Sequence, residues 1–175
     1  RQKHEIDWGA YTPPVPEFLG RRILDDVDLA VLRDYIDWMP FFNAWEFHGK
    51  FPQILEDETV GEAATSLFED ATAMLDRIID ENWLTARAVV GFYAANSDEH
   101  DDVLIYKDEG REDVLERLVH LRQQRTKGAG QPQSCLADFV APADTGRADY
   151  VGAFAVTAGI GIEEHVERFE AAHDD

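Results

Sequence analysis

Apolar side chains recur at helical spacing through one long stretch of the sequence, residues 60–79. They fall every three or four positions, which places them on one face of a helix, and the opposite face is acidic. Thr59 and Glu62 stand at the spacing of a capping box at its start. The pattern therefore predicts an amphipathic helix over 60–79. Its apolar stripe consists of Val60, Ala63, Ala64, Leu67, Phe68, Ala71, Leu75, Ile78 and Ile79.

Three shorter segments have the same periodicity. Residues 28–38 predict a helix with Asp28 as its N-cap, which Pro40 is expected to end or redirect. Residues 111–125 repeat Val and Leu at helical spacing and predict an amphipathic helix, and 163–172 predict a final one.

Runs of β-branched and aromatic residues mark the strands. Residues 86–94 predict a buried strand, and after a polar turn the short run 103–106 predicts a second strand antiparallel to it. Residues 150–157 predict a further strand. Helices and hairpin-like strands are mixed without strict alternation. We therefore predict an α+β fold, with a mixed, largely antiparallel sheet and flanking helices.

The beginning of the chain has a different character. Its three prolines, at 13, 14 and 16, are excluded from a helix interior, so residues 1–20 are expected to form an extended arm. Trp8, Tyr11 and Phe18 are expected to anchor this arm to an α+β body formed by residues 21–175.

Composition narrows the range of partners. The chain of 175 residues holds 16 Lys and Arg against 36 Asp and Glu, which gives a net charge of −20. Nucleic acids and anionic membrane surfaces need clustered basic residues, so neither is an expected partner. A cationic ligand would be attracted, although a charge of this sign also serves solubility alone. No apolar run approaches the roughly 20 residues that cross a bilayer, and the single cysteine fits a reducing cytoplasm.

The sequence offers little support for a metal site or for a catalytic residue. His48, His100, His120 and His165 show no ligand spacing on a common face, and His173 stands in a polar tail, so we predict no metal site. Cys135 borders an apolar run, which favours a small buried hydrophobic residue over a nucleophile. The glycines at 159 and 161 lack the third glycine of a dinucleotide fingerprint and favour a plain turn. We assign no catalytic residue.

Asp37 is the exception among the acidic residues. It stands at the end of the helix expected over 28–38, and an aromatic run at 41–45 follows, which we expect to be buried as helix or strand, before a turn at 49–52. A carboxylate beside so many aromatic rings should be poorly hydrated and should need a partner. That partner is either a local cap or arginine, or a cationic group of a ligand.

An ordered series of motifs resembles one family over almost the whole chain, the reactivation domain of cobalamin-dependent methionine synthase. The motifs that carry the resemblance are 7–8 (DW), 11–14 (YTPP), 35–42 (YIDWMPFF), Trp45, 49–52 (GKFP), 60–63 (VGEA), 89–92 (VVGF), 95–97 (ANS), 101–102 (DD), 121–124 (LRQQ), 135–142 (CLADFVAP), 148–150 (ADY) and 154–157 (FAVT).

The resemblance implies a function. The parent enzyme is a methyltransferase that moves a methyl group from methyltetrahydrofolate to homocysteine through cobalamin. This domain binds S-adenosylmethionine and supports reductive remethylation of cob(II)alamin, with an electron from a flavodoxin-type donor. Cobalamin is held by another domain of the same polypeptide, which is a partner of this one, and zinc belongs to a further domain. The aspartate of the family's I-D-W segment binds the amino group of S-adenosylmethionine, and it corresponds to Asp37.

The resemblance also indicates that one part of the ligand site is missing. The family's later ligand-binding segment, which resembles R-x-A-P-G-Y-P, has no counterpart here. We therefore expect residues 1–175 to be the N-terminal portion of the domain, truncated at its C-terminal end, with weak or no ligand binding and no catalysis of its own.

Lys50, Arg21 and Arg22 are candidates for docking the electron donor. The alternative is an interaction or scaffold domain that keeps the fold without binding the ligand.

Overall fold

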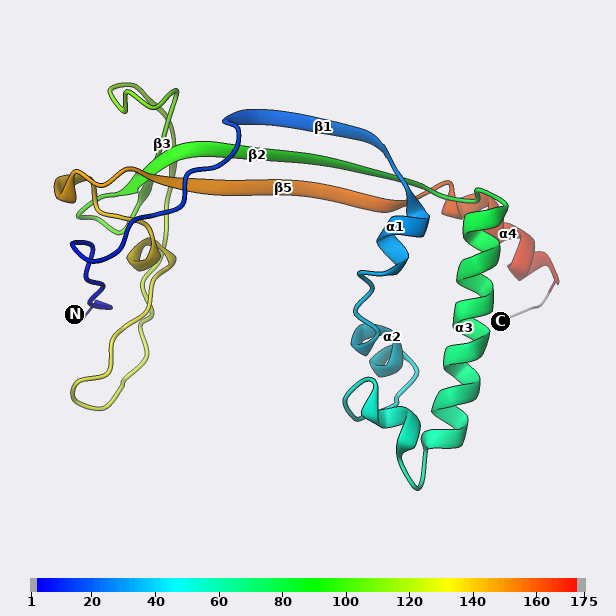
Figure 1. The fold of residues 1–175 in the computed structure, drawn as a ribbon. Helices are drawn as coiled ribbons and strands as arrows, with labels where there is room; N and C mark the ends of the chain where they lie inside the picture. Colours follow the sequence, from blue (N-terminus) through cyan, green and yellow to red (C-terminus); the bar gives the residue numbers. More distant parts are fainter. Residues whose placement is uncertain (1–2, 173–175) are drawn as a thin grey trace. The chain divides into compact units, whose positions relative to one another are not determined.

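A computed structural model describes residues 3–172 as a mixture of helices and antiparallel strands (Figure 1). Hydrogen-bonded strands follow the order β1-β2-β3-β4, and β5 also pairs with β2. The α+β class with a largely antiparallel sheet is thereby confirmed. The strands are β1 (Gly20–Val27), β2 (Thr85–Ser97), β3 (Val103–Tyr106), β4 (Val114–Leu118) and β5 (Asp149–Ile160). The helices are α1 (Leu29–Arg33), α2 (Met39–Ala44), α3 (Gly61–Asp80) and α4 (Ile162–Ala172), with 3-10 turns η1 (Gln53–Glu56), η2 (Leu136–Phe139) and η3 (Ala143–Thr145).

The chain divides into two compact units. The first unit comprises Arg1–Ile23 and Val89–Ala155, and the second comprises Leu24–Ala88 and Val156–Asp175. Strands β1, β2 and β5 contribute residues to both. No helix among residues 3–172 is long and apolar enough to cross a membrane.

Aromatic rings form the core of the second unit. Phe42 of α2 is fully buried, and its ring lies 5.9 Å from that of Phe51 and 6.3 Å from that of Phe68 on α3. The aromatic run at 41–45 is therefore helical, and its exposure is split: Phe42 is buried, whereas Trp45 is 57% exposed. Only one face of α2 packs into this core, because successive residues of a helix point in different directions.

The helix expected over 28–38 is divided into two. Asp28 is the N-cap as predicted and accepts a hydrogen bond from the Ala30 N–H at 2.8 Å, but α1 ends at Arg33. Pro40 then lies in the first turn of α2, where the missing N–H costs nothing, so this proline begins a helix instead of ending one.

Helix α3 confirms the longest prediction, with one correction at its start. Its amphipathic stripe faces the aromatic cluster through Ala64, Leu67 and Phe68. The expected capping box of Thr59 and Glu62 is wrong, since Val60 occupies the N-cap position without a side-chain cap. Asp57 instead accepts hydrogen bonds from the N–H groups of Thr59 and Val60, at 2.8 and 3.0 Å.

Strands dominate the first unit, and one predicted helix is absent from it. β2 and β3 form the expected antiparallel hairpin, with Ala95 opposite Ile105. The helix expected over 111–125 is wrong: β4 forms there and pairs antiparallel with β3. Arg111 adopts a φ of 56°, which is incompatible with a right-handed helix at that point, and the sheet hydrogen bonds of β3 outweigh the local helical periodicity.

The arm is extended over the part that the structure describes, residues 3–19, apart from a turn at 8–10. Phe18 anchors it by an edge contact with Phe92 of β2, at 5.2 Å between ring centroids. Trp8 packs against Tyr11 within the arm. The strand over 150–157 and the helix over 163–172 are confirmed by β5 and α4, and Gly161, at a φ of 101°, makes the turn between them.

Candidate functional site

Asp37 lies in the second unit, in the connection between α1 and α2, and it is exposed. The expectation of a poorly hydrated carboxylate is therefore wrong. The aromatic residues that follow it turn toward their own core: Trp38, for example, packs edge-on against Phe68, with 4.8 Å between ring centroids. Since α1 ends at Arg33, Asp37 is not carried into that core by a continuous helix.

The carboxylate of Asp37 is nevertheless fixed in orientation. Its Oδ1 accepts a hydrogen bond from the Met39 N–H at 3.0 Å, at the start of α2. No hydrogen bond from residues 3–172 engages Oδ2 of Asp37. An exposed carboxylate with one anchored oxygen can accept further hydrogen bonds from a cationic donor such as an ammonium group.

Sequence reasoning missed a second cluster of charged residues, which lies in the first unit. The Arg122 guanidinium is 4% exposed and forms hydrogen bonds with both oxygens of Asp101 and both oxygens of Asp138, at 2.6–2.8 Å. The Asp138 carboxylate is 2% exposed. All three residues stand within motifs that carry the family resemblance, which was the available signal, but the sequence analysis assigned no partner to Arg122.

These bonds change the acidity of the two carboxyls. Hydrogen bonds from Arg122, with a smaller contribution from Lys3, hold the pKa of Asp101 well below its ordinary value despite partial burial. Burial of Asp138 favours its neutral form, but hydrogen bonds from Arg122 and from the Cys135 N–H outweigh this, so the pKa of Asp138 is also lowered. Both groups are therefore ionised in the folded protein at neutral pH.

The lowered pKa values predict a loss of stability in acid. A carboxyl with a lower pKa in the folded than in the unfolded state stabilises the fold above its unfolded pKa of about 4 and loses that contribution as the pH falls toward the folded pKa. We expect the free energy of unfolding, measured by urea denaturation, to fall as the pH is lowered below about 4. The fall should be smaller in Arg122→Met, which lacks the guanidinium. Equal pH dependence in the two proteins would contradict this assignment.

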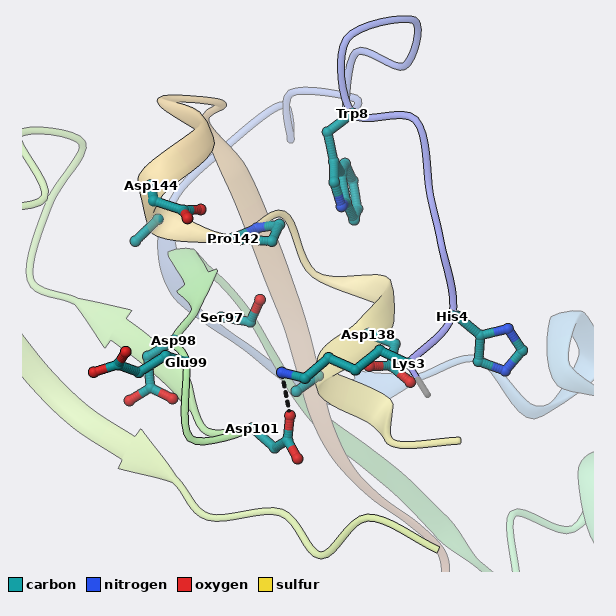
Figure 2. A pocket seen from close by; sticks show the side chains of 12 residues that line it. Lys3, His4, Trp8, Ser97, Asp98, Glu99, Asp101, Asp138, Pro142 and Asp144 are labelled. Atoms are coloured by element: carbon teal, nitrogen blue, oxygen red, sulfur yellow. Dashed lines mark ion pairs between the residues drawn. The ribbon is translucent and has the colours of Figure 1, made fainter. Parts of the chain in front are cut away.

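A pocket of about 460 Å³ lies beside this charged cluster, within the first unit (Figure 2). Its walls come from the arm, from the turn after β2, and from η2 and the start of η3. The Lys3 ammonium reaches into it and lies 2.6 Å from Asp101 Oδ1. The acidic residues that line the pocket favour a positively charged group within it.

The other candidate residues are Cys135, the histidines and three basic residues. Cys135 is buried in the core of the first unit, as expected for a small hydrophobic residue. No group of three or more His, Cys, Asp or Glu in residues 3–172 could hold a metal ion, and His173 lies outside the described residues. Lys50 is exposed in the second unit, and the Arg22 guanidinium lies 3.7 Å from the centroid of the Phe18 ring.

Comparison with known proteins identifies the family. The model of the family described as vitamin B12 dependent methionine synthase, activation domain, matches residues 28–175, and the chain belongs to this family. The resemblance drawn from the sequence is confirmed.

One solved structure extends the comparison to the arm. The chain is similar to the crystal structure of the MetH reactivation domain bound to AdoHcy, with a TM-score of 0.89 and 49% sequence identity. The match covers 99% of this chain and 53% of that one, so the chain spans about half the length of that structure.

Proposed function

We propose that this chain contributes Asp37 to an S-adenosylmethionine site of a methionine synthase, and that the domain supports reductive remethylation of cob(II)alamin held by another domain of the same polypeptide. The observation that carries the proposal is the 49% identity, over 99% of this chain, to a reactivation domain that was solved with AdoHcy bound.

The carboxylate of Asp37 suits this role. S-adenosylmethionine carries an ammonium group, and an exposed carboxylate with one oxygen held by the Met39 N–H presents its other oxygen in a defined direction. A charge-assisted hydrogen bond between the two groups would orient the ligand. The methyl transfer itself is chemistry that the two cofactors supply when bound. The contribution of this chain is to hold the ligand in a defined position and orientation.

The negative charge of the second unit favours the binding of a cationic ligand. Its two segments hold five Lys and Arg against 21 Asp and Glu, so it carries −16 of the net charge of −20. Such a field raises the local concentration of a positively charged ligand. The same field opposes a flavodoxin-type donor, which is itself acidic, so we propose that the donor docks through a local basic group such as the exposed Lys50.

Asp37→Asn tests the role of the charge. We expect this change to weaken S-adenosylmethionine binding by about 1.5–3 kcal/mol, the usual contribution of a hydrogen bond to a charged group. Isothermal titration of a polypeptide that contains the whole activation domain would measure it. Asparagine keeps an oxygen for the Met39 N–H, so the start of α2 is preserved.

Asp34→Asn is the matched control, because it removes an exposed charge three residues earlier, at the C-cap of α1. It should leave the dissociation constant within about a factor of two, as expected for an exposed charge that does not contact the ligand. Equal affinities of Asp37→Asn and the unmodified domain would reject the role of Asp37. Absence of binding by the unmodified domain would favour a domain that keeps the fold for interaction alone.

A further inference from the structure

The ring of Tyr35 stands two residues before Asp37 and is largely exposed. Its exposed fraction of 81% is the highest of any large hydrophobic side chain among the described residues of the second unit. The aromatic residues that follow Asp37 behave differently, since Trp38 packs edge-on against both Phe41 and Phe68. The Tyr35 ring is therefore not used to build the core of this unit.

The backbone between α1 and α2 holds Tyr35 and Asp37 in place. The Tyr35 N–H donates a hydrogen bond to a carbonyl of α1 at 2.9 Å, and the Met39 N–H donates to Asp37 Oδ1 at 3.0 Å. Arg33, at the end of α1, pairs with Asp76 of α3. Both side chains thus start from a backbone that is fixed on either side, which reduces the entropy lost when a ligand binds.

Tyr35 lies within reach of a ligand whose ammonium group is held by Asp37. The Cα atoms of residues two apart in sequence are at most about 7 Å apart, a distance that a tyrosine side chain can span. In S-adenosylmethionine, only the Cα, Cβ and Cγ atoms separate the ammonium nitrogen from the positively charged sulfur. A ligand bound through its ammonium group at Asp37 can therefore bring its sulfur to the Tyr35 ring.

An aromatic ring suits a sulfonium group for a chemical reason. The charged sulfur carries only carbon substituents, so it has no N–H or O–H to donate to a protein acceptor. The face of an aromatic ring attracts such a cation without a hydrogen bond. Once the methyl group has left, the sulfur is a neutral thioether and this attraction is lost.

We propose that Tyr35 is a specificity-determining residue, whose ring contacts the sulfonium group of S-adenosylmethionine. The site then prefers this methyl donor to AdoHcy, which is the same molecule without the transferred methyl group. The preference favours release of the ligand after the methyl group has been used. The inference rests on the proposed function, because it requires the ligand's ammonium group to lie at Asp37.

Tyr35→Leu tests the contact, by isothermal titration of a polypeptide that contains the whole activation domain with each of the two ligands. We expect the variant to bind S-adenosylmethionine about fivefold more weakly, the factor that corresponds to a cation–π contact of about 1 kcal/mol. Its affinity for AdoHcy should change by less than about twofold, because a neutral sulfur makes no such contact. Tyr35→Phe keeps the ring and should keep the preference. Tyr11→Leu is the matched control, because it makes the same substitution at a tyrosine of the arm that is 49% exposed, and it should change neither affinity.

The expected pattern differs from that of Asp37. Both ligands have the ammonium group, so Asp37→Asn should weaken both by a similar factor, whereas Tyr35→Leu should weaken S-adenosylmethionine alone. An unchanged affinity for S-adenosylmethionine in Tyr35→Leu, an equal loss of both ligands, or the same loss in Tyr35→Phe would overturn this inference and leave the role of Asp37 intact. Unchanged binding of both ligands by Asp37→Asn would reject the role of Asp37 and this inference with it.

Discussion

Replacing Arg122 with methionine is expected to lower the free energy of unfolding by about 3–5 kcal/mol, the usual effect of removing one partner from a buried ion pair. The guanidinium is 4% exposed and serves the carboxylates of Asp101 and Asp138 together. Methionine replaces the aliphatic stem of arginine but offers no donor, so Asp138, at 2% exposure, keeps its charge without a cation. Urea denaturation at neutral pH would measure the change.

Arg117→Met is the control for this prediction. Arg117 also pairs with two aspartates, Asp98 and Asp102, but it is 46% exposed. Solvent screens such a pair, and we expect a loss of about 1 kcal/mol or less. Lowering the pH to about 4 should restore part of the stability of Arg122→Met, because the unpaired carboxyls can then become neutral. Similar losses in the two variants would show that burial does not distinguish the clusters.

Replacing Phe42 with alanine is expected to cost about 3–5 kcal/mol of stability, as for other fully buried aromatic residues. Its ring has no exposed surface and packs against Phe41, Phe47, Phe51 and Phe68, with ring centroids 5.6–6.3 Å apart. Alanine would leave a cavity that this aromatic cluster fills only in part. Denaturant titration followed by near-ultraviolet circular dichroism would report both the stability and the packing of the rings.

Trp45→Ala provides the comparison within the same aromatic run. Trp45 is the C-cap of α2 and 57% exposed, and its ring makes a tilted contact with Phe41 at 6.5 Å. Its loss should change the free energy of unfolding by about 1 kcal/mol or less, as is usual for an exposed position. A loss at Phe42 no greater than that at Trp45 would mean that α2 does not hold the core of this unit.

The local pattern of the chain determined its most regular parts. Helix α3 follows from apolar spacing over 20 residues, because no other structure places those side chains on one face. The extended arm follows from its prolines, whose fixed φ and missing N–H act without help from distant residues. The family also followed from sequence, since many short motifs in a fixed order are far more specific than any single one.

Only the tertiary structure decided the rest. Residues 114–118 have helical spacing, yet they form β4, because hydrogen bonds to β3 come from elsewhere in the chain and outweigh local preference. The burial of Arg122 depends on Asp101 and Asp138, which lie 21 and 16 residues away, and no local pattern contains such a pairing. Asp37 is exposed for the same reason: its aromatic neighbours pack against α3, and their partners lie too far along the chain for periodicity to indicate which side they face.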